Sequence, residues 1–506
     1  MPGAAYGLPR SYRYPLVVVD YSRGIHRDGP LDTMPEGKVY DSMDFLLHQP
    51  GVAQKRGGTA YAGPAMTAAT YALLTAWADF GEATTSQLVA IGDNGHFYKI
   101  TAGTTTDVST LGAGFFPSGT AVSRQKPIVR MGGTPLLVIP GNDGATIPKK
   151  YDGTTVANLA ASAPTCKYGC VYKSRLVLGG TGTNLNRIFF SPTPDITAAW
   201  DTTNSWIDAD HSITGMASLS NAIIVFSTGA TERIIGSTPP PGSDMDRAPI
   251  GSIGCTDARS IVVIDNNAIF ANPKGVFMTN GAGFSSLTRE GGIESYWQSL
   301  LVGYERIGWT ISAGVIRGAY YIVSILNGST LVDTLVCNIA TRSWWRMSNI
   351  KAMAFASTTD IAEELYYADR STNRVTALSG IFLPTASNKN DANGTPVTPQ
   401  LTTGGLGLAS FLKHIGHARV GYDMRDAASD LPTLAVSIAP GMEATTFRTV
   451  PESPLAATTD FLRKRFRVDS VTQLLTVKFV QSNASSKTEI YGMDFDRRYL
   501  GLEPVV

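Results

Sequence analysis

Cysteine is scarce in this chain, whose 506 residues contain only four, at positions 166, 170, 255 and 337. So few and so scattered thiols exclude a small secreted scaffold held together by disulfides. Cys166 and Cys170 are close in sequence, but no second pair of Cys or His lies near them, so their spacing gives little support for a zinc site. We interpret all four as ordinary, partly buried thiols.

Charge is also low. Charged residues make up 16% of the chain, and 42 basic against 41 acidic side chains leave a formal net charge of +1. A tight nucleic-acid binder normally carries a basic surplus on one domain. The balance argues against such a binder, although it is compatible with contact with DNA along a smooth neutral surface.

Long apolar runs are missing. A helix needs roughly 18 to 20 apolar residues to cross a bilayer, and no stretch approaches this length. The longest apolar run near the start, Leu16–Val19, is too short for the core of a signal peptide. We expect a soluble protein without a membrane-spanning segment, made in a cytoplasm.

Motifs of known catalytic sites are absent from the sequence. It contains no Asp-box of the sialidase type, no His-Glu-x-x-His, no Gly-x-Ser-x-Gly and no phosphate loop. His414 and His417 lack an obvious third metal ligand, and in a regular strand they would point to opposite faces. We expect no enzyme, no cofactor and no metal site.

Three short clusters still need an explanation. The acidic pairs Asp208–Asp210 and Glu363–Glu364 have the chemistry that glycoside hydrolysis requires, but such pairs also occur on any solvated turn. The aromatic cluster Trp344–Arg346 has the composition to stack on a sugar or a base. We expect it to pack in a core or an interface instead, because aromatic side chains bury large areas there.

Glycine and proline, in contrast, are plentiful, at 51 and 28 residues, which is typical of a turn-rich β protein. The clearest unit is Ile261–Arg289, where three short strand-like runs alternate with turns at Asp265–Asn267 and Asn272–Gly275. Such hairpins start roughly 40 to 58 residues apart, which is close to the spacing of propeller blades. A pair of β-sandwiches or a β-helix would give a similar density of strands and turns.

This pattern divides the chain into four parts. Residues 1–80 are broken repeatedly by Pro and Gly and predict an arm or a cap on the first sheet. Residues 81–383 predict the propeller, residues 384–407 a linker or long loop, and residues 408–506, with their apolar and polar alternation, a β-sandwich. The expected fold class is all-β: a six- or seven-bladed β-propeller with an N-terminal arm or cap and a C-terminal β-sandwich.

Two groups of basic side chains are the candidate interface residues. The first lies beside glycines in turns of the N-terminal segment, where it would cap the first sheet or reach a neighbour: Arg23, Arg27, Lys55 and Arg56. The second favours a salt-bridged subunit interface or a solvated strand over DNA readout: Arg463, Lys464, Arg465 and Arg467.

Four stretches together resemble the nozzle (tail tubular) proteins of tailed bacteriophages and related phage propeller proteins. The first leads to a turn of the form Pro-Gly … Lys-Arg-x-Gly-Thr, the second contains Gly-Val-Phe … Thr, the third ends in aromatic residues and Arg, and the last belongs to the expected sandwich. They are Arg23–Gly63, Ala271–Arg289 with Gly292–Trp297, Asn338–Met347, and Thr488–Tyr499.

The resemblance implies a structural virion protein of the phage tail. It implies a ring, commonly a hexamer, that lies distal to the portal and adaptor, contacts distal tail or fibre proteins, retains the genome and conducts double-stranded DNA during ejection. The chain lacks the large insertions of some nozzle proteins, so the resemblance does not imply docking sites for receptor fibres. The alternatives are another tail component, such as a baseplate, spike or fibre base, and a propeller that binds or degrades polysaccharide.

Overall fold

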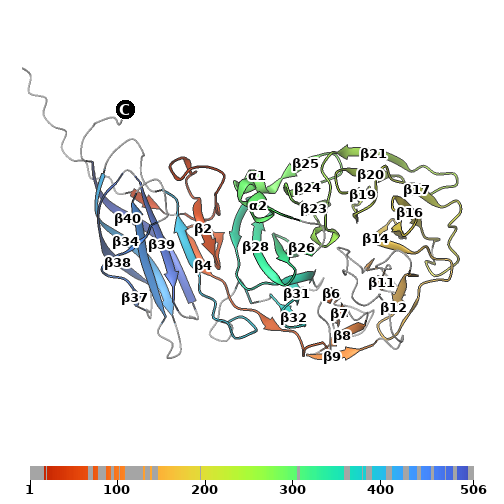
Figure 1. The fold of residues 1–506 in the computed structure, drawn as a ribbon, viewed down its shortest axis with the longest axis horizontal. Helices are drawn as coiled ribbons and strands as arrows, with labels where there is room; N and C mark the ends of the chain where they lie inside the picture. Colours follow the sequence, from red (N-terminus) through yellow and green to blue (C-terminus); the bar gives the residue numbers. More distant parts are fainter. Residues whose placement is uncertain are drawn as a thin grey trace, which may run out of the picture.

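The computed structural model describes residues 16–18, 20–66, 72–77, 87–92, 96–101, 103–108, 129–130, 137–139, 146–193, 195–304, 308–357, 365–378, 380–382, 390–405, 413–425, 432–440, 446–456, 461–472, 474–482 and 487–499. These residues form forty strands, two short α-helices and two 3-10 helices. The molecule is elongated, with a propeller at one end and a sandwich at the other (Figure 1).

Seven sets of four antiparallel strands form the blades of the propeller in the described chain (Figure 1). Blades 1 to 4 are, in order, β6 (Ala72–Trp77), β7 (Gln87–Gly92), β8 (Phe97–Thr101), β9 (Thr104–Asp107); β10 (Val129–Arg130), β11 (Leu137–Ile139), β12 (Lys149–Tyr151), β13 (Val156–Asn158); β14 (Cys166–Tyr172), β15 (Arg175–Thr181), β16 (Arg187–Phe190), β17 (Trp206–Asp208); and β18 (Gly215–Ser218), β19 (Ile223–Phe226), β20 (Thr231–Ile235), β21 (Asp246–Gly251).

Blades 5 to 7 complete the circle. They are β22 (Val262–Ile264), β23 (Asn267–Asn272), β24 (Gly275–Thr279), β25 (Phe284–Ser286); β26 (Trp309–Ile316), β27 (Tyr320–Asn327), β28 (Thr330–Asn338), β29 (Ser343–Arg346); and β30 (Ala352–Ser357), β31 (Leu365–Asp369), β32 (Arg374–Ala377) with β5 (Ala60–Tyr61). The first strands of adjacent blades contact one another, as β26 does with β30 and β30 with β6, so the fourth strands lie on the outside. The predicted propeller is confirmed, and the described chain has seven blades.

Blade 5 is the unit that the sequence marked most clearly. Its first hairpin turns at Asp265 and Asn266, whose φ angles are 45° and 59°. An Asn or Asp side chain tolerates this left-handed region better than most residues, which is why the turn was visible in the sequence. The blade leads into α1 (Leu287–Gly291) and α2 (Glu294–Leu300), and the 3-10 helix Ala258–Ser260 precedes it.

The last blade is closed by the N-terminal part of the chain. Thr376 and Ala377 of β32 pair antiparallel with Tyr61 and Ala60 of β5. The outermost strand of blade 7 therefore precedes blade 1 in the sequence. This pairing completes the four-stranded blade and ties the two ends of the propeller together.

Two sheets face each other in the sandwich. The outer sheet has the order β3 (Phe45–Gln49), β4 (Val52–Lys55), β40 (Lys487–Tyr499), β34 (Lys413–Arg425), β38 (Leu462–Thr472), with β1 (Leu16–Val18) paired to β40. The inner sheet has the order β2 (Val39–Met43), β33 (Gln400–Thr403), β39 (Leu475–Gln481), β35 (Thr433–Pro440), β36 (Arg448–Thr449), with β37 (Leu455–Ala456) paired to β35. The 3-10 helix Leu31–Thr33 precedes β2.

One sheet runs through both parts of the molecule. β2 pairs antiparallel with β33 of the sandwich and parallel with β29 of blade 6, where Met43 is opposite Arg346. The result is a continuous ten-stranded sheet, with nine strands in order from β26 to β36 and β37 paired to β35. The propeller and the sandwich are thus joined by hydrogen-bonded strands and not by a flexible linker.

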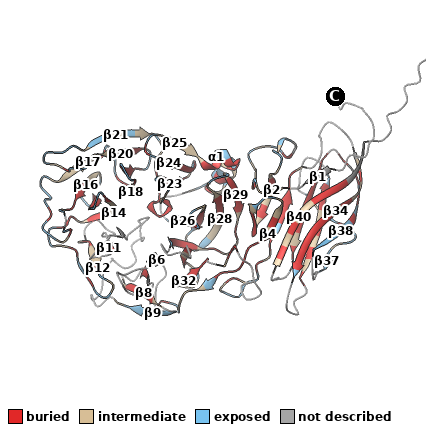
Figure 2. Ribbon diagram, turned by 180° about the vertical axis from the view of Figure 1, so that it is seen from behind, coloured by how far each residue is buried: buried red, intermediate tan, exposed pale blue. Residues whose placement is uncertain are grey.

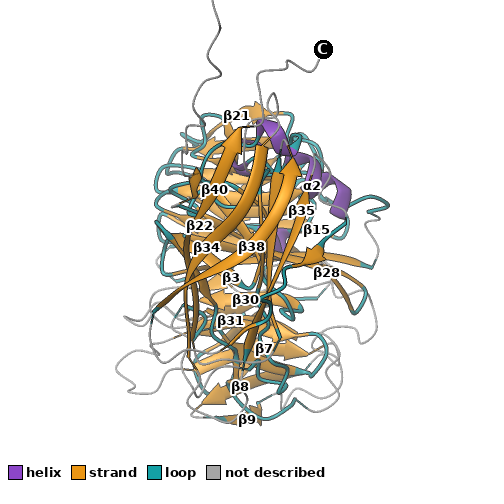
Figure 3. Ribbon diagram, turned by 90° about the vertical axis from the view of Figure 1, so that its left-hand side faces the viewer, coloured by secondary structure: helices purple, strands orange, loops and turns teal. Residues whose placement is uncertain are grey.

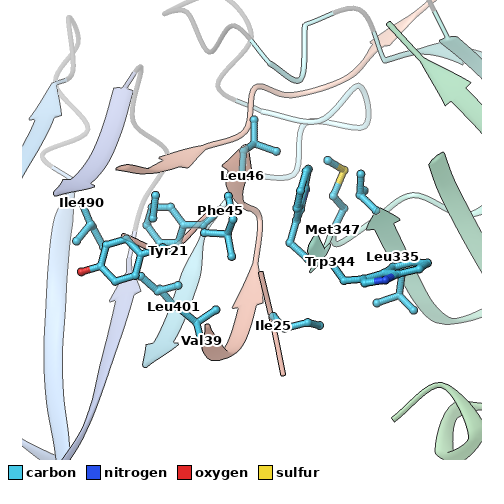
Figure 4. Packing of buried hydrophobic residues seen from close by; sticks show 14 of the residues in the cluster. Tyr21, Ile25, Val39, Phe45, Leu46, Leu335, Trp344, Met347, Leu401 and Ile490 are labelled. Carbon is cyan, nitrogen blue, oxygen red and sulfur yellow. The ribbon is translucent and has the colours of Figure 1, made fainter. Parts of the chain in front are cut away.

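The hydrophobic core is continuous across the same boundary. Figure 4 shows Ile490, Leu401 and Tyr21 from the sandwich side, the middle residues Phe45, Leu46, Val39 and Ile25, and Trp344, Met347 and Leu335 from blade 6, all in one buried cluster. Trp344 and Trp345 are fully buried, which confirms that this pair packs in a core. The indole Nε1 of Trp344 donates to the carbonyl oxygen of Leu287 at 3.0 Å.

The structure places two expected segments differently from a local interpretation. Strands β1 to β4 of the expected arm, residues 1–80, are members of the two sandwich sheets, and β5 belongs to blade 7. The expected loop 384–407 contains β33, which pairs with both β2 and β39. These partners lie far away in sequence, so no local pattern identifies them.

Candidate assembly surfaces

The acidic residues considered for catalysis are engaged with arginines where the structure describes them. The guanidinium of Arg187 donates to both carboxylate oxygens of Asp208, at 2.8 and 3.0 Å. Asp210 lies 2.7 Å from Arg247. Each carboxylate serves a surface ion pair, and the pair Glu363–Glu364 lies outside the described residues.

The two histidines share a face of β34. A bulge lies between Ile415 and His417, and because Ile415 and Ala418 are both buried, it leaves His414 and His417 on the outward side. Our expectation of opposite faces was wrong for this reason. His414 Nε2 lies 3.0 Å from Asp469 Oδ1, and no group of three or more His, Cys, Asp or Glu among the described residues is arranged to hold a metal ion.

All four cysteines are buried. Burial raises the pKa of Cys170 and of Cys255 to about 12, and it raises the pKa of Cys166 and of Cys337 further. A thiol with such a pKa carries almost no thiolate at neutral pH, and the thiolate is the reactive form. The expected ordinary, buried thiols are confirmed.

A buried arginine holds the sandwich against the propeller. Arg56 follows β4 and is fully buried. Its Nε donates to Asp44 Oδ1 at 2.6 Å, and its two terminal nitrogens donate to both oxygens of Asp391, at 2.8 and 2.9 Å. A further bond, 3.0 Å long, joins Nη2 to the carbonyl oxygen of Ser348, just after blade 6. Arg56 thus connects three segments that are distant in sequence.

The electrostatics of this cluster favour a permanently charged guanidinium. Burial by itself would lower the pKa of Arg56, but the carboxylates of Asp44 and Asp391 outweigh it and raise the pKa. Asp44 also accepts the Ser348 N–H at 2.9 Å and its hydroxyl at 2.5 Å. The charge is therefore buried with its partners in place, which is the condition for a stable buried ion pair.

A second cluster joins the N-terminal segment to blade 6 and α2. Arg27 lies 2.9 Å from Asp41, which also accepts Arg346 Nη1 at 3.1 Å. Arg346 in turn donates through Nε to Asp333 at 2.8 Å, and the hydroxyl of Tyr296 donates to the same oxygen at 2.6 Å. Burial raises the pKa of Asp333, and the nearby Arg346 opposes this shift.

The first group of predicted interface residues thus lies mainly inside the molecule. Lys55 and Arg56 are fully buried, so neither offers a surface to another subunit. Arg27 is partly buried, with its guanidinium 4.2 Å from the centre of the Tyr296 ring. Only Arg23 is exposed, and its Nη1 donates to the carbonyl oxygen of Glu36 at 3.3 Å. The segment connects parts of one chain.

The second group lies on the surface. Arg463, Lys464, Arg465 and Arg467 are all exposed and belong to β38, the terminal strand in the pairing order of the outer sheet. Arg463 forms an ion pair with Asp494, and Arg467 forms one with Asp469 at 2.7 Å. This strand is the candidate assembly surface that the structure leaves accessible.

Sequence reasoning missed the acidic partners of the buried arginine. Asp391 lies in the stretch expected to be a loop, and nothing local marks it. Asp44 gave a weak signal, because an Asp between two apolar strands suggests a turn, and its φ of 60° places it in the left-handed region. Buried charges are rare and usually paired, so the buried position of Arg56 became informative only with the fold.

No helix in the described part of the chain is long and apolar enough to cross a membrane. No protein-family model matches the sequence, and no curated protein matches it.

Among solved structures, the chain is similar to BBS1N in complex with ARL6DN, soaked with lead, with 13% identity and a TM-score of 0.41 over 64% of this chain and 96% of that chain. It is also similar to Hsv2 from Kluyvelomyces marxianus, with 12% identity and a TM-score of 0.29 over 46% of this chain and 68% of that chain. Both TM-scores lie below 0.5, so these likenesses do not bear on what the chain does.

Proposed function

We propose that this chain is a structural subunit of a bacteriophage tail, which forms a nozzle ring distal to the portal and adaptor. The proposal rests on the resemblance of the four stretches described above to phage nozzle proteins. The ring would retain the genome and conduct double-stranded DNA during ejection. Its other partners would be the distal tail or fibre proteins.

The observation that carries the proposal is the continuous ten-stranded sheet between blade 6 and the sandwich. A subunit that must hold pressurised DNA and stay aligned with its neighbours needs a fixed relation between its parts. Hydrogen-bonded strands and a shared core supply this relation, whereas domains joined by a linker move by default. The fold therefore supports a mechanical role.

The near-neutral charge supports the same role. The conduit of a ring should let DNA slide, and a strongly basic wall would bind its phosphates. A formal net charge of +1 on 506 residues fits a wall that DNA passes without tight binding. Sequence readout of the DNA is not part of the proposal.

Location in the virion is the direct test. An antibody against the purified chain, labelled with gold, should mark the distal end of the tail on phage particles from the source of this sequence. Label on the baseplate, on a spike or at a fibre base would assign the chain to another tail component. Release of reducing sugar from host polysaccharide by the purified chain would favour the enzymatic alternative instead.

A further inference from the structure

A group of basic side chains and a group of acidic side chains lie at opposite ends of the long axis. The outer sheet of the sandwich faces away from the propeller, with β40, β34 and β38 in front when that end faces the viewer (Figure 3). Blades 3 and 4, with β17 and β21, lie at the other end of the molecule (Figure 1).

The sandwich end is basic. Phe466 and Val468 point into the core, so by alternation Arg463, Arg465 and Arg467 lie on the outward face of β38. Arg419 of β34 is the register partner of Arg465 and adds to this face. The carboxylate of Asp494 pairs with both Arg463 and Arg419, so its single negative charge leaves a net positive charge on the three side chains. Lys464 alternates with these arginines, and its register partner Val420 is buried, so Lys464 lies on the other face of β38. We call the set Arg419, Arg463, Arg465 and Arg467 the basic edge.

Apolar surface borders the basic edge. Phe461 is 51% exposed and Leu462 is 43% exposed, which makes them two of the most exposed large apolar side chains of the described chain. Further along the strand, Glu452 accepts the backbone N–H of Arg467 at 3.0 Å, so a loop covers that part. Exposed aromatic and aliphatic side chains next to arginines are typical of protein–protein interfaces.

The opposite end carries acidic loops. Blades 3 and 4, residues 166–251, are nearly balanced, with seven acidic and six basic residues, but the loops that lead to their fourth strands are acidic. Asp195 and Asp201 lie exposed in the loop between β16 and β17. Asp244 lies exposed just before β21, and Asp246 is the exposed first residue of that strand. Strand β21, the outermost of blade 4, contains exposed and half-buried residues but no buried one (Figure 2). We call these four residues the acidic face.

The four carboxylates share one side of the propeller. Both loops connect the third strand of a blade to its fourth strand, and strands alternate in direction within every blade. Equivalent loops of neighbouring blades therefore lie on the same side, near the outside. The acidic face is thus a single region that spans blades 3 and 4.

Local hydrogen bonds favour the ionised form of Asp195, Asp201 and Asp244. Bonds from the Thr197 hydroxyl and N–H lower the pKa of Asp195, and bonds from Asn204 lower that of Asp201. The N–H groups of Thr238 and Ser237 lower the pKa of Asp244 to about 2. The nearby Arg247 is already paired with Asp210 and Glu232.

We propose that the basic edge of one copy docks on the acidic face of a second copy, head to tail. The two surfaces lie at opposite ends of one molecule, so they cannot satisfy each other within a chain. Because they are different surfaces, the contact is heterologous, and repeated contacts close into a ring when the rotation between copies permits it. The ring geometry rests on the proposed function, whereas the contact itself does not.

Self-association of the purified chain tests the contact. Sedimentation equilibrium at about 50 mM NaCl should show concentration-dependent association that weakens as salt screens the charges. Arg465→Glu should weaken association about three- to tenfold, since it replaces attraction by repulsion. Lys274→Glu is the matched control: it makes the same charge change at an exposed site of blade 5 and should leave association unchanged.

Mixing supplies a second test, carried out on variants whose circular dichroism and melting temperature match those of the wild type. Arg463→Glu with Arg465→Glu, and separately Asp195→Lys with Asp201→Lys, should each self-associate weakly, and an equal mixture of the two variants should regain association. A chain that stays monomeric at every concentration, equal losses for Arg465→Glu and Lys274→Glu, or a mixture without recovery would each overturn the contact. Gold label at the tail tip would stand unaffected by such a failure, so the proposed function fails or survives separately.

Discussion

Arg56 and Asp391, 335 residues apart in sequence, form a two-pronged ion pair in which both terminal nitrogens of the arginine reach the carboxylate, at 2.8 and 2.9 Å. The arginine follows a sandwich strand, and the aspartate precedes the strand that joins the sandwich to β2. Both side chains are almost fully excluded from solvent. The pair fixes the boundary between sandwich and propeller.

Replacing Arg56 by Met should destabilise the chain by about 3 to 5 kcal/mol, because Asp44 and Asp391 would stay buried without their countercharge. Arg56→Lys should also lose stability, since an ammonium cannot reproduce the forked geometry. Urea unfolding monitored by tryptophan fluorescence gives the comparison. Arg23→Met, at an exposed site, should stay within about 0.5 kcal/mol of the wild type. A similar small change for Arg56→Met would contradict the role given to the pair.

Gly24 should tolerate no side chain. Its φ is +77°, and a Cβ there would lie 2.4 Å from the backbone nitrogen of Trp344 and 2.6 Å from its carbonyl oxygen. Gly24→Ala therefore combines left-handed strain with a backbone clash and should cost about 2 to 5 kcal/mol. Gly318, with φ +59° and nothing within 4 Å, isolates the strain, so Gly318→Ala should cost only about 1 kcal/mol. Equal losses in thermal unfolding would show that the contact with Trp344 is unimportant.

Lys38 gives a pH-dependent prediction. Burial lowers the pKa of this lysine from 10.5 to about 8, while its Nζ donates to the carbonyl oxygen of Gly291 at 2.7 Å. Between these two pH values the unfolded chain holds more protons at this site than the folded chain does, so the lysine's contribution to stability rises with pH.

The measurement is the free energy of unfolding at several pH values between 8 and 10.5. The difference between wild type and Lys38→Met should rise on the order of 1 kcal/mol across this range. The buried thiols of Cys166, Cys170 and Cys255 lower stability in the same range, but they do so equally in both proteins and cancel. Cys337 interacts electrostatically with Lys38, so both proteins should carry Cys337→Ala. Lys274→Met, at an exposed site, should give a flat difference. A flat difference for Lys38→Met as well would refute the assignment.

Removal of residues 1–61 should unfold the rest of the chain, because these residues supply strands to the sandwich and to the propeller. It would delete β3 and β4 from the outer sheet, β2 from the ten-stranded sheet and β5 from blade 7. The exposed strand edges should make the truncated chain aggregate. Size-exclusion chromatography with circular dichroism should show loss of the folded species, and a soluble, folded propeller would contradict the interlocked arrangement.

The sequence predicted the parts of the fold that depend on local turns. Asp265 and Asn266 marked a hairpin because their side chains suit positive φ, and repeated turns of this kind indicated the blades. The burial of the Trp344–Trp345 pair followed from the size of the rings. In the candidate assembly surface, the basic residues of β38 were visible as a cluster in a neutral chain.

Pairings over long sequence distances stayed hidden. Lys55 and Arg56 look like exposed charges beside a turn, and only the partners Asp44 and Asp391 make their burial possible. β33 is short and lies between Pro- and Gly-rich stretches, so its place between β2 and β39 could not be predicted. The acidic face could not be predicted for the same reason, because two loops of different blades form one region only in the folded propeller.

Cryo-electron microscopy of intact phage particles that carry this chain tests the central claim most directly. The account predicts a closed ring of copies below the portal and adaptor, around the DNA path, with propeller and sandwich of each copy in the fixed relation described above. Particles in which the chain is absent, or occurs as isolated copies away from the DNA path, would contradict it.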